Sequence, residues 1–258
     1  MKTSLGFSVL LMSAFCLLVS PAEAQVIKAI DFSNASGYQD GLLEGQPAGE
    51  ADVWFNGASG AGVDTSRFAV ENEQLVVTQN EVDNQWIILM IPVQQGTFFA
   101  TWEWQYIGAS DSTVDFGFTL SDTENFGSTD GNPNLGFGQM GVMVRMNADP
   151  DLDVRNGDFS GGGSYETLVP YDYRDGAKIT MRVEVDAEAW LFDAYAQKEG
   201  EDEVMLADEY GFRLMPSLET NGVNCIALWC NGDEQGNQVI LDNILIYGET
   251  PVLDWSLF

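Results

Sequence analysis

Apolar and polar residues alternate with a period of two along most of this chain, and this pattern limits the possible folds more than any other feature. Neighbouring side chains on a strand point to opposite faces of a sheet, so each such segment has one apolar and one polar face. The alternating segments are Arg67–Val70, Gln74–Thr78, Gln85–Ile91, Thr97–Ile107, Thr113–Leu120, Gly138–Met146, Lys178–Val185, Trp190–Ala196 and Val239–Tyr247. We find no convincing amphipathic helix longer than a turn or two between them.

Turn-forming dipeptides separate these segments. They are Asp40-Gly41, Asn56-Gly57, Asp130-Gly131, Asn156-Gly157, Asp175-Gly176, Asn221-Gly222 and Asn231-Gly232. Such pairs readily adopt the positive φ angles of tight turns. The chain is therefore predicted to be all-β, a two-sheet antiparallel sandwich. Two long, polar, glycine-rich stretches, Ser36–Gly62 and Ala148–Ser164, are expected to be rim loops, where binding residues usually lie.

The N-terminal residues have the features of a signal peptide. Lys2 precedes an apolar run, Leu5–Val19, which is short for a membrane span, and small residues follow at Ala22 and Ala24. We expect residues 1–24 to be removed, leaving a single domain over residues 25–248 and a tail over residues 249–258. A retained membrane anchor is the alternative. No second long apolar run is present, so no membrane span is expected in the mature chain.

Charge and composition exclude several kinds of function. The 258 residues include 40 acidic and 10 basic ones, a formal net charge of −30, and no histidine. A polyanion is repelled by phosphate backbones, so we expect no nucleic-acid partner. Without histidine, Ser-His-Asp catalysis and histidine-ligated zinc are impossible. Carboxylate chemistry, calcium binding or non-catalytic binding remain, and the acidic surface itself is typical of proteins in salty surroundings.

Two sequence motifs, one near each end of the expected domain, resemble those of a known family. Gly37–Gln46 contains the pattern Y-x-D-G-x-L-x-G-Q and is followed by Trp54, and the last strand contains Asp242-Asn243-Ile244. The chain resembles the concanavalin A-like (laminin-G-like) jelly-roll domains of secreted bacterial proteins. That resemblance implies a protein exported to the periplasm, the cell surface or the medium, with an extracellular glycan or polysaccharide as partner. A non-catalytic carbohydrate-binding or surface-associated module is the first expectation, and a structural extracellular protein without a sugar site is another.

An enzymatic alternative rests on three alternating carboxylates, Glu184, Asp186 and Glu188. They resemble the E-x-D-x-E strand of glycoside hydrolase family 16, a retaining family with this architecture. The resemblance implies Glu184 as nucleophile, Asp186 as its helper and Glu188 as acid/base. The competing interpretation is an ordinary strand that ends in a hairpin turn at Asp186, which leaves Glu188 off the strand.

Aromatic residues supply the candidate sugar contacts, because sugar rings stack on aromatic faces while amides and carboxylates bind the hydroxyls. The candidates in or near the expected loops are Trp54, Asn56, Tyr165, Tyr171 and Tyr173. A second aromatic stripe, Trp102, Trp104 and Tyr106, lies on one face of a strand, and we expect it to pack in the core.

Asp149, Asp151 and Asp153 form the candidate metal site. Carboxylates at alternate positions can converge on Ca²⁺, so a structural calcium ion is one expectation. Solvated acidic loops are the other.

Two cysteines outside the expected leader, Cys225 and Cys230, have an odd separation on one expected strand. They therefore point to opposite faces, about 16 Å apart, whereas a disulfide needs Cα atoms within about 7 Å. We expect two free, buried thiols. Nothing in the sequence predicts an oligomeric state.

Overall fold

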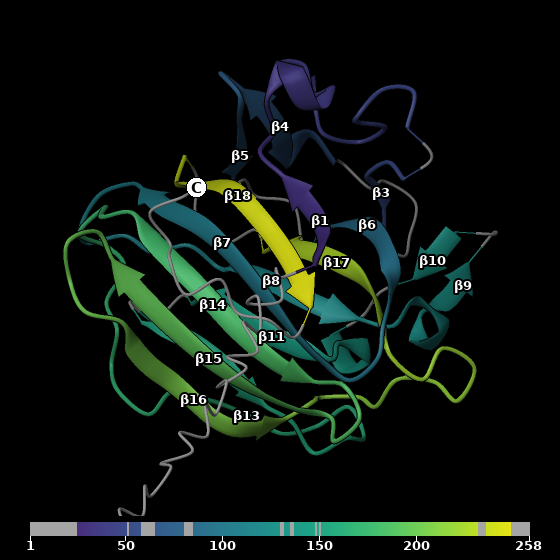
Figure 1. Cartoon of the computed structure of the whole chain (residues 1–258). Coiled ribbons are helices and arrows are strands. Elements are labelled where there is room, and N and C mark those ends of the chain that lie inside the picture. The colour runs from purple at the N-terminus through teal and green to yellow at the C-terminus, as the bar shows by residue number, and fades with distance from the viewer. Residues whose placement is uncertain are drawn as a thin grey trace, which may run out of the picture.

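The computed structural model describes residues 25–50, 52–57, 65–79, 85–129, 132–134, 137–147, 149, 151–231 and 236–248. Two antiparallel sheets lie face to face as stacked layers (Figure 1). The expected signal peptide, residues 1–24, and the expected tail, residues 249–258, lie outside the described residues. No helix within the described ranges is long and apolar enough to cross a bilayer.

The larger sheet has nine strands in the order β16-β15-β14-β7-β18-β5-β4-β2, with β1 also paired to β18. Their bounds are β1 Val26–Ile30, β2 Gly41–Leu42, β4 Phe68–Glu71, β5 Gln74–Thr78, β7 Thr97–Ile107, β14 Ile179–Asp186, β15 Leu191–Lys198, β16 Val204–Gly211 and β18 Gln238–Gly248.

The smaller sheet has seven strands in the order β13-β12-β11-β8-β17-β6-β3. Their bounds are β3 Phe55–Asn56, β6 Gln85–Gln94, β8 Phe116–Ser121, β11 Val142–Met146, β12 Leu152–Asn156, β13 Ser164–Glu166 and β17 Val223–Cys230. A separate pair, β9 Gly127–Thr129 and β10 Asn132–Asn134, and four short 3-10 turns complete the described elements: η1 Asn34–Ser36, η2 Thr65–Arg67, η3 Thr123–Asn125 and η4 Phe137–Gln139. The predicted two-sheet antiparallel sandwich is confirmed.

The prediction of a rim loop over Ala148–Ser164 is wrong in its centre, because β12 occupies Leu152–Asn156. Leu152 and Val154 are buried in the core, whereas Asp153 and Arg155 point to the other face. A strand with only two inward apolar residues carries too weak an alternation to stand out among acidic and glycine residues. This strand supplies much of the site described below.

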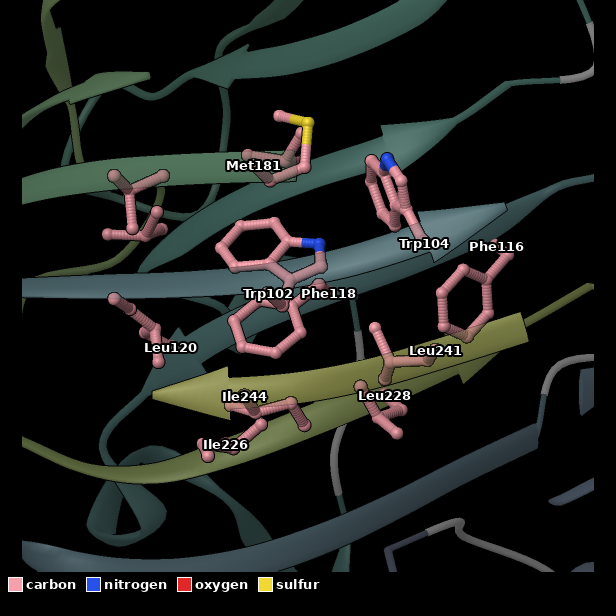
Figure 2. Close-up of a cluster of buried hydrophobic side chains, with 14 of the residues drawn as sticks. Trp102, Trp104, Phe116, Phe118, Leu120, Met181, Ile226, Leu228, Leu241 and Ile244 are labelled. Atoms are coloured by element: carbon pink, nitrogen blue, oxygen red, sulfur yellow. The ribbon is translucent and has the colours of Figure 1, made fainter. Parts of the chain in front are cut away.

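The predicted aromatic stripe packs between the two sheets. Trp102 and Trp104 project from β7 toward Phe116 and Phe118 of β8 (Figure 2). The rings of Trp102 and Phe118 are stacked with centroids 3.9 Å apart, and both tryptophans are buried. Large aromatic side chains contribute most of the apolar area that such a core removes from water. The expectation that this stripe forms core is confirmed.

The last strand changes partner at its Asp-Asn-Ile motif. β18 pairs with β5 as far as Leu241 and with β1 from Ile244 onward. Between them Asn243 has a φ of 51°, and the register with β7 shifts. Asparagine adopts this left-handed conformation more readily than most residues, which explains its place at the irregularity.

Cys225 and Cys230 are both free and buried, as predicted. Because they face opposite sides of β17, Cys230 belongs to the main core, and Cys225 belongs to a second apolar cluster on the outer face of the seven-stranded sheet.

Candidate functional site

The outer face of the seven-stranded sheet is divided into an apolar half and a charged half. Strand registers place one row of residues across this face: Trp86, Trp229, Gly117, Arg145 and Asp153, from β6, β17, β8, β11 and β12 respectively. The two tryptophans lie at one end of the row and the ion pair of Arg145 and Asp153 at the other, with Gly117 between them.

The apolar half is closed. Trp86 and Trp229 are 3% and 1% exposed, so neither offers a face to a ligand. A Cβ on Gly117 would lie 2.9 Å from Met143 Cε and 3.1 Å from Trp229 Cε3. Glycine is needed there because any side chain would displace the packed methionine or indole.

The charged half is built around the ring of Tyr165, on edge strand β13. The guanidinium carbon of Arg145 lies 3.6 Å from the ring centroid, and that of Arg155, the cross-strand partner of Tyr165, lies 4.6 Å away. Arginine stacks well on aromatic faces, through both charge and planarity. We call Arg145, Arg155, Arg213 and Tyr165, together with Asp115 and Asp153, the arginine–tyrosine cluster.

Two aspartates neutralise part of this charge. Arg145 donates from Nε and Nη2 to Asp153 Oδ2 at 3.3 and 3.0 Å, and its Nη1 lies 3.6 Å from Asp115 Oδ1. Burial raises the pKa of Asp153, an effect that the hydrogen bonds and charge of Arg145 oppose and the nearby Asp149 and Asp151 reinforce. Forming this ion pair therefore costs free energy, because the charged groups lose bound water. The pair nevertheless holds Arg145 against Tyr165.

Among the residues that the structure describes, Arg155 has no such partner. The exposed fraction of Arg155 is only 8%, and its Nε has no hydrogen-bond partner. Within the described part of the chain, no carboxylate oxygen lies within 4.0 Å of its guanidinium, whereas Arg174 has one carboxylate partner and Arg145 and Arg182 have two each.

Arg213 follows β16 and donates from Nε to the Gly161 carbonyl at 2.8 Å. Burial lowers the pKa of Arg213, and the neighbouring positive charge of Arg155 adds to that decrease. Three of the chain's six arginines thus share one half-buried region.

Tyr165 is the one predicted carbohydrate-binding residue that lies in this cluster. It is partly exposed, its hydroxyl donates to Met143 Sδ at 3.1 Å, and burial raises its pKa. The arginines are not among the residues predicted from the sequence. The alternation Leu152-Asp153-Val154-Arg155 is the signal that could have shown two charged side chains on one strand face.

Burial corrects the expected roles of two aromatic residues. Trp54 is fully buried and donates from Nε1 to Tyr38 Oη at 3.1 Å, and Tyr173, also fully buried, accepts at Oη from the Val114 amide at 3.1 Å. Neither has a surface on which a sugar could stack.

The other two predicted contacts are not members of the cluster: Tyr171 belongs to the main core, and Asn56 lies on β3, at the opposite edge of the sheet from β13. Tyr171 is only 7% exposed, and Asn56 is half-buried on β3.

The three carboxylates of the enzymatic alternative are not gathered on one strand. Glu184 lies on β14 of the nine-stranded sheet, with Oε2 3.8 Å from Arg182 Nη1. The strand ends at Asp186, whose Oδ1 accepts from the amides of Glu188 and Ala189 at 3.0 and 2.9 Å. Glu188 is exposed in the following turn, so the hairpin interpretation is confirmed and the strand arrangement of the hydrolase motif is not found.

The predicted calcium ligands also diverge. Asp153 points to Arg145, while Asp151 pairs through its backbone with Asp172. Among the residues with described positions, no group of three acidic, cysteine or histidine side chains is placed to hold a metal ion. Calcium at Asp149, Asp151 and Asp153 stays a prediction.

A cavity of about 350 Å³ lies on the nine-stranded sheet, beside the irregularity of β18. Its lining includes Glu103, Arg182, Glu203 and Asn243. These charged groups are paired with one another or with neighbours: Arg182 with Glu203 at 2.7 Å, and Glu103 with Lys178 at 3.0 Å. These charged groups that line the cavity are therefore already paired, whereas the guanidinium of Arg155 in the arginine–tyrosine cluster has no carboxylate within 4.0 Å among the described residues.

No protein-family model matches the chain, and no curated protein matches its sequence. Solved structures do match. Lectin I-B4 of Griffonia simplicifolia, in its metal-free form, superposes with a TM-score of 0.55 at 9% identity, covering 85% of this chain and 98% of the lectin. The fold is that of the concanavalin A-like lectins.

Two further structures agree. A CBM2 module of the evolved Dit protein of Lactobacillus casei BL23 phage J-1 gives a TM-score of 0.54 at 10% identity, over 88% of this chain and 97% of the module. A lectin from Bauhinia forficata in complex with GalNAc gives 0.50 at 10% identity, over 87% of this chain and 99% of the lectin. At sequence identities of 9 to 10%, the similarity to these structures concerns the fold alone.

Proposed function

We propose that this protein binds a carbohydrate outside the cell, through the arginine–tyrosine cluster, without transforming it. The observation that carries the proposal is the stack of Arg145 and Arg155 on the partly exposed ring of Tyr165, with Asp153 beside it. Sugar sites combine a flat apolar surface with rigid donors and acceptors, because each hydroxyl both donates and accepts. The cluster supplies guanidinium donors and carboxylate acceptors held in place by strand pairing.

The fold supports this function. Chains of the same fold include proteins named as lectins, one of them in complex with GalNAc. A fold alone does not determine function, so the residues of the cluster are the basis of the proposal. Export by the predicted signal peptide would bring that cluster into contact with extracellular or cell-surface polysaccharides.

A polysaccharide screen tests the proposal. The purified protein would be run in affinity gels and applied to a glycan array, together with Tyr165→Ala and a control, Glu184→Gln, on the opposite sheet. We expect wild type and the control to bind the same glycans and Tyr165→Ala to bind them about tenfold more weakly, a loss of about 1.4 kcal/mol. Equal binding by all three proteins would place the sugar site elsewhere, and no binding by any of them would reject the function.

A further inference from the structure

The arginine–tyrosine cluster concentrates positive charge on a chain that has little of it. The whole sequence has 10 basic residues against 40 acidic ones. The guanidinium carbons of Arg145 and Arg155 nevertheless lie 3.6 and 4.6 Å from the centroid of the Tyr165 ring, and Arg213 is near enough for its charge to act on Tyr165. Arg145 is paired with Asp153 at 3.0 Å and with Asp115 at 3.6 Å. Burial lowers the pKa of Arg213, and the like charge of Arg155 adds to that decrease. A bound negative group would therefore lower the electrostatic energy of these arginines.

Arg155 is where that negative group is missing. A cation removed from water is normally paired or fully hydrogen-bonded, because its desolvation is costly. The exposed fraction of Arg155 is 8%, and its Nε has no partner. By contrast, Arg174 and Arg182 on other surfaces reach carboxylates at 2.9 and 2.7 Å. The ring of Tyr165 compensates Arg155 only in part, at 4.6 Å.

We infer that the bound glycan is acidic and that its carboxylate or sulfate ester pairs with Arg155. This inference rests on the proposed carbohydrate-binding function. The planar fork of a guanidinium suits two oxygens of one oxyanion, and the neighbouring Arg213 adds positive charge beside it. Tyr165 lies directly across the strand pair from Arg155, so a sugar carrying the anion would meet the partly exposed ring at the same time.

The net charge of −30 opposes this binding at long range. Salt screens such repulsion beyond about 10 Å at about 0.1 M, whereas contacts inside a half-buried cluster are screened much less. The assay therefore uses about 0.15 M and about 0.5 M NaCl. Selective binding of a polyanion under these conditions points to a local site, because the chain as a whole repels it.

Two matched pairs of polysaccharides test the inference. Kappa-carrageenan is compared with agarose for the sulfate ester, and polygalacturonate with its methyl ester for the carboxylate. Affinities are measured by calorimetry for wild type, Arg155→Gln, Arg155→Lys and the control Arg182→Gln. We expect the acidic member of at least one pair to bind about tenfold more tightly than its neutral counterpart. Arg155→Gln should abolish that preference, Arg155→Lys should retain part of it, and Arg182→Gln should leave it intact.

The outcomes separate the two hypotheses. Equal binding of acidic and neutral members would overturn the acidic ligand while glycan binding stands. A preference for the acidic members that survives Arg155→Gln would also overturn it, since Arg155 would then play no part. Binding of none of the four polysaccharides, combined with a negative glycan array, would reject carbohydrate binding and the acidic ligand together. If Arg155→Gln does not fold, as judged by circular dichroism, Arg155→Lys and Arg213→Gln carry the same comparison.

Discussion

Arg145 and Tyr165 stack at 3.6 Å although β12 lies between their strands in the sheet. The long arginine side chain reaches across β12, where Asp153 accepts its hydrogen bonds on the way. Arg155 of β12 approaches the same ring. Three neighbouring strands are thereby joined on their outer face by one stacked group, and changes in any of its members should affect both binding and stability.

Tyr165 should tolerate loss of its hydroxyl better than loss of its ring. Tyr165→Phe keeps the surface on which Arg145 stacks and removes only a weak hydrogen bond to Met143 Sδ, so we expect less than about 1 kcal/mol of destabilisation. Tyr165→Ala should cost about 2 kcal/mol. Urea unfolding of both variants measures the difference. Equal destabilisation by the two would show that the hydroxyl, and not the stack, holds the strand edge.

Asp153 should make stability depend on pH in a defined direction. Burial raises its pKa above the ordinary 3.8, so the native state holds this proton more tightly than the unfolded chain does. The stabilising contribution is fully present below pH 3.8 and is lost as pH rises through the raised value. The unfolding free energy of wild type minus that of Asp153→Asn should therefore fall as pH rises from about 3.5 to about 6.5. A rising difference would mean that the ion pair with Arg145 outweighs burial.

Cys225 and Cys230 should be unreactive in the native protein. Burial raises the pKa of Cys225 strongly and that of Cys230 to about 12, so almost no thiolate exists at pH 8 and access is blocked as well. Labelling with a thiol reagent should proceed only after unfolding in guanidinium chloride, at the rate of unfolding. Rapid labelling of the folded protein would contradict the placement of β17 between its two neighbours.

Trp54 should be a structural residue. Trp54→Phe removes the hydrogen bond from Nε1 to Tyr38 Oη and leaves part of the buried volume empty, so we expect about 1 to 3 kcal/mol of destabilisation. Binding of any glycan should be unchanged at temperatures where the variant is folded. A selective loss of binding with normal stability would return Trp54 to the candidate contacts.

Calcium removal should leave the cluster intact. Asp153 accepts hydrogen bonds from Arg145, so its carboxylate is already engaged without a metal. We expect the melting temperature and glycan affinity to be the same before and after dialysis against a chelator. A fall in both, restored by CaCl₂ and absent in Asp149→Asn, would instead support the calcium site predicted from Asp149, Asp151 and Asp153.

The local sequence pattern was sufficient to predict the class of fold. In Thr97–Ile107 the alternation alone predicts which face is buried, and Trp102, Trp104 and Tyr106 lie there. The separate faces of Cys225 and Cys230 follow from the same period-two geometry, and the turn after Asp186 follows from the run Asp186-Ala187-Glu188-Ala189, which resembles a hairpin turn. Each of these features depends on residues adjacent in sequence, so the sequence contains the information needed to predict it.

The site required information that no local pattern contains. Arg145, Arg155 and Tyr165 come together because β11, β12 and β13 are neighbours in a particular register. Arg213 joins them from the segment after β16, a strand of the opposite sheet. The sequence by itself determined the alternation, the turns and the acidic character. Only the tertiary structure decided which aromatics are buried and that Arg155 has no carboxylate within 4.0 Å among the described residues, because strand order and register bring distant charges together.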